Sequence, residues 1–408
     1  MTTTINNEHK KLNVPNLRFP EFQGEWEKKS LGEIGDSFIG LTYKPTDVVS
    51  EGGLIVFRSS NIQNGCMDYK DIVRVNKNVK EKLITKKDDL LVCARNGSAR
   101  LIGKNAILHE ADANQTFGAF MMVFRSDKNH FVHQLLNTKR YSSQVSENLG
   151  ARINQITSSD LSSFEFFFPT ENSEMNKIAA LLDLIDERIA TQNKIIDKLQ
   201  SLIKGLNDTL YAQHGDEVVT SFAELGTSYS GLSGKSAQDF GSGKPFITYL
   251  NVYSNNVINE NDFQYVAIKD GEKQNIVEYG DVLFTLSSET PNEVGIGSVY
   301  LGKEKVYLNS FCFGIHITNT KVAFSPYLSY YVSSTAFRKF IYPYAQGSTR
   351  FNLCKVDFEK ASIKLPTLGH QKRINFILSH IDCKMETEIQ MLNLYNSQKQ
   401  YLLRQMFI

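Results

Sequence analysis

The chain lacks a long apolar run. Its longest, Thr116 to Phe124, spans nine residues, about half of what a helix needs to cross a membrane. The first residues, MTTTINNEHKKLNVPN, are polar and have no apolar core of the kind that a secretory signal carries. We therefore expect a cytoplasmic protein that does not enter a membrane.

Cysteine is scarce, and its spacing excludes two kinds of site. The five cysteines, at positions 66, 93, 312, 354 and 383, are odd in number and far apart, and no two form a C-x-x-C pair. This pattern suits a reducing compartment better than a disulfide framework, and it offers no zinc-binding spacing. We expect no metal bound by this chain.

Catalytic motifs are absent or broken. Gly234-Lys235-Ser236 resembles the end of a phosphate-binding loop, but Tyr229 stands where the first glycine is required. The segment GIGSVY at 295–300 lacks the third glycine of a dinucleotide loop. No Asn-Pro-Pro-Tyr or Asp-Pro-Pro-Tyr tetrapeptide of an amino-methyltransferase occurs, and the pair His130 and His133 reads as two surface histidines. We predict a non-catalytic chain that binds no cofactor of its own.

Excess charge of one sign is also missing. Lysine and arginine number 45 against 44 acidic residues, and 41% of the 408 residues are apolar. These are ordinary globular values, and the length suggests two or three domains. A protein that depends on phosphate contacts often has a basic domain, and this composition gives no indication of one.

The chain repeats itself once, with a period of about 190–200 residues. The segment SLGEIGDSFIGL (30–41) matches SFAELGTSYSGL (221–232), and DDLLVCARNG (88–97) matches GDVLFTLSSE (280–289). Further on, an offset of 196 places Ile178 on Ile374 and Asp186 on Asp382. Arg152 and Arg350 also correspond, and we interpret them as structural links between each globule and its helix. A period this long indicates two copies of a whole domain rather than a solenoid.

Each copy reads as a mixed, mainly β globule followed by a long helix. Short apolar runs bounded by Gly, Asp and Asn predict strands, and two short helices are expected before each long one, near 130–147 and 326–342. The predicted strands include 53–57, 89–93, 281–285 and 311–317.

The long helices carry the clearest periodicity. Apolar residues alternate in steps of four and three from Ile178 to Leu210, and again from Ile374 to Met406, which is the a/d seam of a coiled coil. Each seam has a polar residue near its midpoint, Gln192 and Glu388 respectively. In an antiparallel pair related by a pseudo-twofold axis these two would face each other as one register-fixing layer. The alternative is that both lie on a loosely packed, wet stretch.

These features resemble the specificity subunit of type I restriction–modification enzymes. The resemblance rests on the duplicated globule–helix order, on the opening LRFPEF…EW (17–26), and on the blocks Phe168-Pro169 and Gln371-Lys372-Arg373-Ile374. It implies an α+β fold with two target recognition domains separated by two long antiparallel helices. The implied segments are a leader 1–21, recognition domains 22–170 and 213–366, and spacer helices 171–212 and 367–408.

The resemblance also implies function and partners. Each recognition domain would read one half of a split target in double-stranded DNA, and the helices would dock two methyltransferase subunits. Those partners would use S-adenosylmethionine to methylate adenine N6, and restriction subunits would add translocation and cleavage driven by ATP and Mg²⁺. Residues 26–170 carry 19 basic against 16 acidic side chains, and 216–366 carry 13 against 15. We therefore expect the isolated chain to bind DNA weakly.

Candidate DNA contacts lie on polar, glycine-bearing loops, because Arg, Lys, Asn, Gln, Ser and Thr read base edges and Lys and Arg hold phosphates. In the first domain the candidates are Lys44, Arg58, Ser60, Asn61, Arg95, Asn96, Ser98 and Arg100. In the second they are Lys235, Lys244, Thr248, Tyr249, Asn251, Ser287, Ser288 and Thr290. The corresponding loops differ between the copies, which predicts two unlike half-sites. The alternative function is a duplicated coiled-coil scaffold that binds proteins and no DNA.

Overall fold

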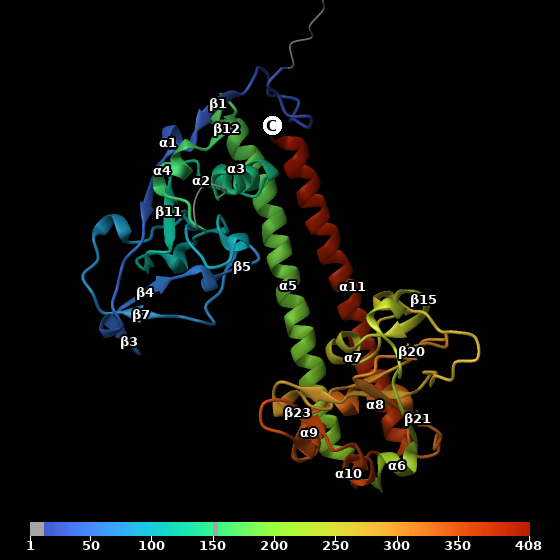
Figure 1. Ribbon diagram of the computed structural model, residues 1–408. Coiled ribbons are helices and arrows are strands. Elements are labelled where there is room, and N and C mark those ends of the chain that lie inside the picture. Colours follow the sequence, from blue (N-terminus) through green and yellow to red (C-terminus); the bar gives the residue numbers. More distant parts are fainter. Residues whose placement is uncertain (1–11, 150–153) are drawn as a thin grey trace, which may run out of the picture. The chain divides into compact units, whose positions relative to one another are not determined.

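The computed structural model describes residues 12–149 and 154–408 (Figure 1). Contacts within the chain divide it into two compact units, unit 1 (residues 1–194 with 389–408) and unit 2 (residues 195–388). None of the helices in the described part of the chain is long and apolar enough to cross a membrane. Each unit contains one recognition domain together with one half of each long helix, so the boundary cuts both helices rather than running along them.

Unit 1 is built from short strands and helices ahead of the first long helix. Its helices are α1 (Leu31–Ile34), α2 (Asn129–Leu135), α3 (Lys139–Leu149), α4 (Ser158–Ser163) and the first half of α5 (Asn172–His214). Its strands are β1 (Glu27–Ser30), β2 (Asp36–Ile39), β3 (Val48–Val49), β4 (Leu54–Phe57), β5 (Ile62–Gln63), β6 (Cys66–Met67), β7 (Arg74–Val75), β8 (Leu90–Cys93), β9 (Asn105–Ile107), β10 (Thr116–Phe117), β11 (Met121–Arg125) and β12 (Glu165–Phe168).

Unit 2 repeats this order. Its helices are α6 (Phe222–Leu225), α7 (Tyr249–Ser254), α8 (Ser325–Ser333), α9 (Thr335–Ile341), α10 (Lys355–Lys360) and the first half of α11 (Leu368–Met406). Its strands are β13 (Val218–Thr220), β14 (Gly226–Ser230), β15 (Phe240–Ile247), β16 (Gln264–Val266), β17 (Val282–Thr285), β18 (Ser287–Ser288), β19 (Gly297–Val299), β20 (Tyr307–Leu308), β21 (Cys312–Ile317), β22 (Ala345–Gln346), β23 (Phe351–Leu353) and β24 (Ile363–Leu365).

The two units share one sheet topology. A four-stranded antiparallel sheet has the order β2-β11-β8-β9 in unit 1 and β14-β21-β17-β19 in unit 2. Each unit also pairs its first strand with its last, β1 with β12 and β13 with β24, so the ends of each recognition domain meet. A short parallel pair recurs as well, β10 with β4 and β20 with β15. The predicted strands at 53–57, 89–93, 281–285 and 311–317 are confirmed as β4, β8, β17 and β21.

The short helices expected before each long helix are also found, as α2 and α3 in unit 1 and as α8 and α9 in unit 2. The long helices begin and end within two residues of the predicted spacer boundaries. In unit 1 the seam residues Ile178, Leu182 and Ile185 are buried in the same core as Leu403 and Met406. In unit 2 Ile374 and Leu378 are buried beside Leu206 and Leu210. In each unit, therefore, the start of one long helix packs against the end of the other.

The polar members of the seams are buried. Gln192 and Glu388 are each 5% exposed, and Lys384 forms an ion pair with Glu388 one helical turn away. Both the register-fixing layer and its alternative stay predictions, because a contact between Gln192 and Glu388 would be a contact between the two units.

The leader is joined to the first long helix by an arginine. Arg18 contacts the Glu174 carboxylate through Nε and Nη2, both at 2.7 Å, and the indole Nε1–H of Trp26 donates to Glu174 Oε1 at 3.3 Å. Glu174 is 1% exposed, and burial of a polar group costs free energy unless it is hydrogen-bonded. The segment LRFPEF…EW therefore has a structural role at the first turn of α5.

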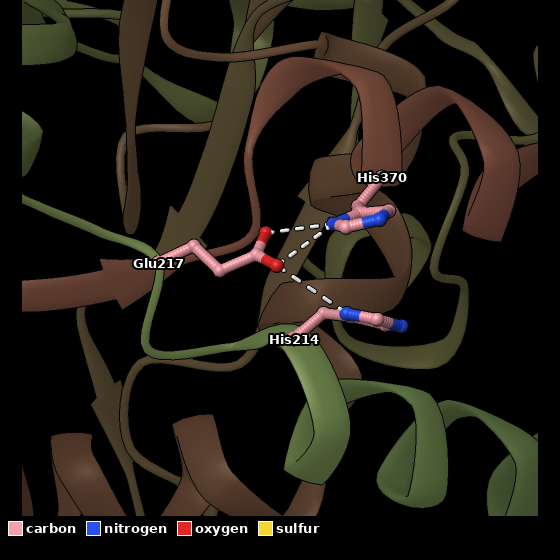
Figure 2. A group of neighbouring side chains, drawn as sticks. All are labelled: His214, Glu217 and His370. Carbon is pink, nitrogen blue, oxygen red and sulfur yellow. Dashed lines mark hydrogen bonds and ion pairs between the residues drawn. The ribbon is translucent and has the colours of Figure 1, made fainter.

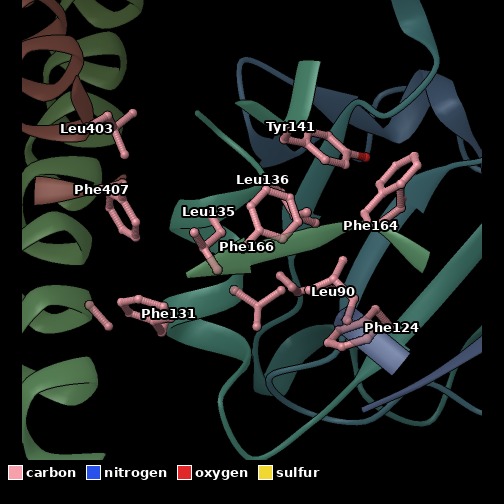
Figure 3. Close-up of a cluster of buried hydrophobic side chains, with 14 of the residues drawn as sticks. Leu90, Phe124, Phe131, Leu135, Leu136, Tyr141, Phe164, Phe166, Leu403 and Phe407 are labelled. Atoms are coloured by element: carbon pink, nitrogen blue, oxygen red, sulfur yellow. The ribbon is translucent and has the colours of Figure 1, made fainter. Parts of the chain in front are cut away.

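The core of unit 1 takes residues from both ends of the chain, and Figure 3 shows two of its last members, Leu403 and Phe407. Phe407, near the end of the chain, lies 5.3 Å from the ring of Phe131 and 6.4 Å from that of Trp26, and the Leu17 backbone N–H donates to the Gln405 carbonyl at 2.8 Å. The last residues thus complete the first recognition domain. In unit 2 the corresponding core is an aromatic cluster of Phe222, Phe284, Phe337 and Phe358.

Phe407→Ala should destabilise unit 1 by about 3–5 kcal/mol, because it removes a buried ring and leaves a cavity. Trp26 is the only tryptophan, so its fluorescence reports the unfolding of this unit in a urea titration. Phe376→Ala, on a side chain of α11 that is 63% exposed, is the control and should leave the midpoint unchanged. Equal midpoints for the two variants would contradict the assigned core.

Candidate nucleic-acid interface

In unit 1 the structure brings two of the predicted loops together. The Nδ2 atom of Asn96, in the loop after β8, donates to the Ser59 hydroxyl at 3.0 Å, and Ser59 lies in the loop after β4. The second loop is held by a third segment, since Asn154 Nδ2 donates to the Gly97 carbonyl at 3.0 Å. Both loops therefore belong to one surface of the domain.

In unit 2 the equivalent loops also meet. The Tyr249 hydroxyl, at the start of α7, donates to the Ser287 carbonyl at 2.8 Å. The Ser288 hydroxyl donates to Glu293 at 3.1 Å, and the same carboxylate accepts a bond from the Tyr253 hydroxyl at 2.9 Å. Residues 59 and 249 occupy the same place in the repeat, so one contact between the same two loops recurs with different side chains.

Only some of the candidate DNA contacts proposed from the sequence have side chains that a ligand could reach. Among the candidates, Lys44, Arg95, Arg100, Lys244 and Thr290 are exposed, and Arg58, Ser60, Asn96, Ser98, Thr248 and Tyr249 are half-buried. Arg58 forms an ion pair with Asp71 at 2.7 Å. Ser287 and Ser288 are buried to 5% and 8% exposure. Whether any of them contacts DNA stays a prediction.

Three candidates have their polar atoms engaged inside the protein. The Asn61 amide, 1% exposed, donates to the carbonyls of Asp68 and Asp71, and the Asn251 amide, 3% exposed, donates to the Asn259 carbonyl. The Lys235 ammonium lies 2.6 Å from Glu272, and its side chain is 6% exposed. These groups stabilise their loops, and a contact of any of the three with DNA stays a prediction.

Sequence reasoning missed three residues beside these loops, one in unit 1 and two in unit 2. Phe120 and Phe311 are each 58% exposed beside the loops after β8 and β17, and Arg350 places its guanidinium 3.3 Å from the Ser287 hydroxyl. The sequence suggests Arg350 as a link to the helix, but its side-chain hydrogen bonds go to Ser287. Its counterpart Arg152 lies outside the described residues. Exposed aromatic side chains leave no signal in an apolar pattern, which cannot tell a surface ring from a core ring.

Two groups of side chains have the composition of metal ligands. In unit 2, His370 Nδ1 lies 2.8 Å and His214 Nδ1 3.3 Å from the Glu217 carboxylate, and the two imidazoles stack at 4.0 Å (Figure 2). In unit 1, His133 lies near Asp183 and Asp186. The latter carboxylates already accept bonds from Gln134, and Lys399 pairs with Asp186 at 2.5 Å.

These groups differ in their protonation. The hydrogen bond from His370 lowers the pKa of Glu217 to about 2, so this carboxylate is ionised at neutral pH. Burial lowers the pKa of His133 to about 4, which keeps the imidazole neutral there. Both ring nitrogens of His133 lack a hydrogen-bond partner among the described residues. As arranged, the first group links the end of α5 to the start of α11 within unit 2.

The comparisons with known proteins concern both units. The family described as the type I restriction modification DNA specificity domain matches residues 23–201 and 227–394. The chain is 25% identical over 283 residues to the specificity subunit of the type I restriction enzyme EcoKI from Escherichia coli K12, covering 63% of this chain and 60% of that subunit. It is 26% identical over 197 residues to the StySPI specificity subunit from Salmonella potsdam, covering 46% of this chain and 42% of that subunit. The chain thus spans 60% or less of these relatives' lengths.

Two solved structures have the same fold. The S subunit of a type I restriction–modification system from M. genitalium gives a TM-score of 0.58 at 15% identity, covering 97% of this chain and 99% of that one. A chain from a structure concerned with complex assembly of a type I system gives a TM-score of 0.50 at 14% identity, covering 93% and 96%.

Asn61→Ala should destabilise the protein by about 1–3 kcal/mol, because a buried side chain that donates to the Asp68 and Asp71 carbonyls and accepts from the Arg58 N–H is removed. Ser60→Ala, next to it on a half-buried side chain, is the control and should change the free energy of unfolding by less than about 0.5 kcal/mol. Urea titration of both variants measures this. An Asn61→Ala protein as stable as wild type would contradict the structural role assigned to Asn61.

Glu217→Gln should lower the thermal midpoint at neutral pH and remove the pH-dependent contribution that the ionised carboxylate makes to stability. The folded pKa of about 2 lies below the unfolded value of about 4.3, so the stabilisation is present above pH 4.3 and declines as pH falls toward 2. Melting curves between pH 3 and 7 should therefore show the two proteins converging at the acid end. A constant difference across this range would contradict the role assigned to the ionised carboxylate.

Proposed function

Because this chain belongs to the family of type I restriction–modification DNA specificity domains, we propose that it is the subunit that reads the DNA target. Unit 1 reads one half-site and unit 2 the other, and the pair directs partner subunits that methylate adenine N6 or restrict unmethylated DNA. The chain itself supplies recognition and no catalysis.

One observation supports this proposal most directly. In both units the loop after β4 or β15 contacts the loop after β8 or β17, through Asn96 and Ser59 in one copy and Tyr249 and Ser287 in the other. The framework beneath is the same, and the side chains on it differ. That combination suits two readers of unlike sequence, since base edges are distinguished by side-chain chemistry.

The near-neutral charge bears on affinity. With 45 basic and 44 acidic residues, the chain releases few counterions on binding DNA, and this electrostatic contribution supplies much of the affinity of DNA-binding proteins. Two linked weak readers gain joint affinity because binding of one raises the effective concentration of the other at its half-site. Partner subunits supply further phosphate contacts.

Those partners are two methyltransferase subunits and the restriction subunits of the complex, in the cytoplasm. They use S-adenosylmethionine, ATP and Mg²⁺; this chain needs none of these for recognition. The long helices offer apolar side chains for docking a methyltransferase, with Leu184 60%, Phe376 63% and Leu394 68% exposed. Exposed apolar groups on a surface helix commonly mark a protein interface when they gather into a patch.

Single-molecule methylation sequencing of host DNA, with the gene intact and deleted, tests the proposal. We expect N6-methyladenine at one split, asymmetric motif to disappear on deletion. A protein scaffold that binds no DNA is the competing function. Unchanged methylation in cells that express the methyltransferase bound to this chain would favour the scaffold and overturn DNA reading.

Arg95→Ala should relax one half-site and leave the other intact. Loss of a base-contacting arginine costs about 1–3 kcal/mol of discrimination, which appears as methylation at degenerate versions of that half-site. Arg140→Ala is the control, because Arg140 stacks on Phe167 and donates to the Glu165 carbonyl outside the loops. Equal relaxation of both half-sites would contradict the assignment of one half-site to each unit.

A further inference from the structure

An exposed phenylalanine occurs at the same place in both recognition domains. Phe120 ends the turn between β10 and β11, and Phe311 ends the turn between β20 and β21. Each side chain is 58% exposed, although the next residue in each case, Met121 or Cys312, is fully buried. Both rings therefore stand out from the border of a closed core.

Backbone hydrogen bonds establish that the two positions are equivalent. The Phe120 carbonyl accepts from the Ala94 N–H at 2.9 Å, and the Phe311 carbonyl accepts from the Leu286 N–H at 2.9 Å. The turn is closed by Met121 N–H to the Gly118 carbonyl in one copy. The same bond runs from Cys312 N–H to the Asn309 carbonyl in the other. The rings thus project from identical backbone, next to the strand end that carries the candidate reading loop.

A lone exposed apolar side chain needs no explanation, but recurrence in both copies does. The neighbouring loops diverge completely, ARNG in one copy against LSSE in the other, while the phenylalanine is kept by both. Packing does not account for it, because more than half of each ring faces solvent. The ring is therefore retained for something that the unbound domain does not contain.

The surroundings of Phe120 are cationic, since the Arg95 guanidinium lies 5.2 Å from the centroid of its ring. The position equivalent to Arg95 in unit 2 is Ser287, and Arg350 places a guanidinium 3.3 Å from the serine hydroxyl. In each copy, therefore, an arginine guanidinium belongs to the loop after β8 or lies against the equivalent loop after β17, although it comes from a different point of the sequence. A protein-docking centre is usually surrounded by further apolar groups, whereas an aromatic ring among arginines and polar loops is typical of nucleic-acid surfaces.

We propose that Phe120 and Phe311 are base-stacking residues, each of which inserts against a base step of the half-site that its domain reads. This inference rests on the proposed DNA-reading function. Apolar side chains used in this way unstack a step and bend the duplex, and the contact tolerates any base because every base has an aromatic face. That explains why the two copies keep the ring while their specificity loops differ.

The test uses the full chain with its methyltransferase and a labelled duplex carrying the motif found by methylation sequencing. Phe120→Ala and Phe311→Ala should each weaken binding about tenfold to a hundredfold, and Phe→Trp at each position should bind within about threefold of wild type. Tyr279→Ala is the matched control. It removes a ring that is 61% exposed just before β17, at the opposite end of that strand from Leu286, and should have no effect on affinity.

A scan of single abasic nucleotides through each half-site then locates the contact. At one step, removal of the base should weaken the wild-type complex and cost nothing further in Phe120→Ala, because both changes delete the same interaction. Phe311→Ala should couple in this way to a step in the other half-site.

The outcomes separate the two claims. If the wild-type complex prefers its motif but both alanine variants bind like Tyr279→Ala, base stacking is wrong and DNA reading stands. If the affinity lost in an alanine variant adds in full to the affinity lost at every abasic position, base stacking is likewise wrong. A wild-type complex with no preference for the motif would overturn the proposed function itself.

Discussion

Burial of the helix seams is the constraint on which the structure depends. Neither recognition domain closes its core alone: unit 1 needs Ile178, Leu182 and Ile185 from α5 together with Leu403 and Met406 from α11. Unit 2 needs Ile374 and Leu378 from α11 beside Leu206 and Leu210 from α5. Because burial of such side chains is the main stabilising contribution in a fold of this size, each domain is joined rigidly to both helices. The candidate interface and the long-helix segments therefore form one body within each unit.

The same constraint leaves the reading loops free to change. The backbone bonds that hold the loops, such as Ala94 N–H to the Phe120 carbonyl and Leu286 N–H to the Phe311 carbonyl, do not depend on side-chain identity. Their buried anchors are amides and hydroxyls directed inward, as at Asn61 and Asn251. A domain built in this way can acquire new specificity through a few exposed residues while its framework remains stable.

Much of this architecture could be predicted from the sequence, for physical reasons. The seams from 178 to 210 and from 374 to 406 repeat too regularly to be anything but long packed helices, and the four predicted strands are short apolar runs closed by Gly, Asp or Asn. The duplication could be recognised from the sequence because equivalent backbone positions need similar residues, as in SLGEIG and SFAELG. The resemblance to specificity subunits drew on these same features, and the family match agrees with it.

The candidate interface was less predictable. Polarity suggested Asn61, Asn251 and Lys235 as contacts, but a polar side chain in a loop serves the loop as readily as a ligand, and only the fold shows that these three are satisfied internally. Conversely, Phe120 and Phe311 lie within apolar stretches that read as strand, so nothing in the pattern marks them as exposed. The arginine at 350 reaches the surface from a distant segment, which no local motif reports.

Mapping of photochemical cross-links between the assembled complex and its methylated motif tests the central claim most directly. The account predicts cross-links in one half-site to residues 95–100 and 120, and in the other half-site to residues 287–290, 311 and 350. Cross-links confined to the long helices, with none on these loops, would contradict it.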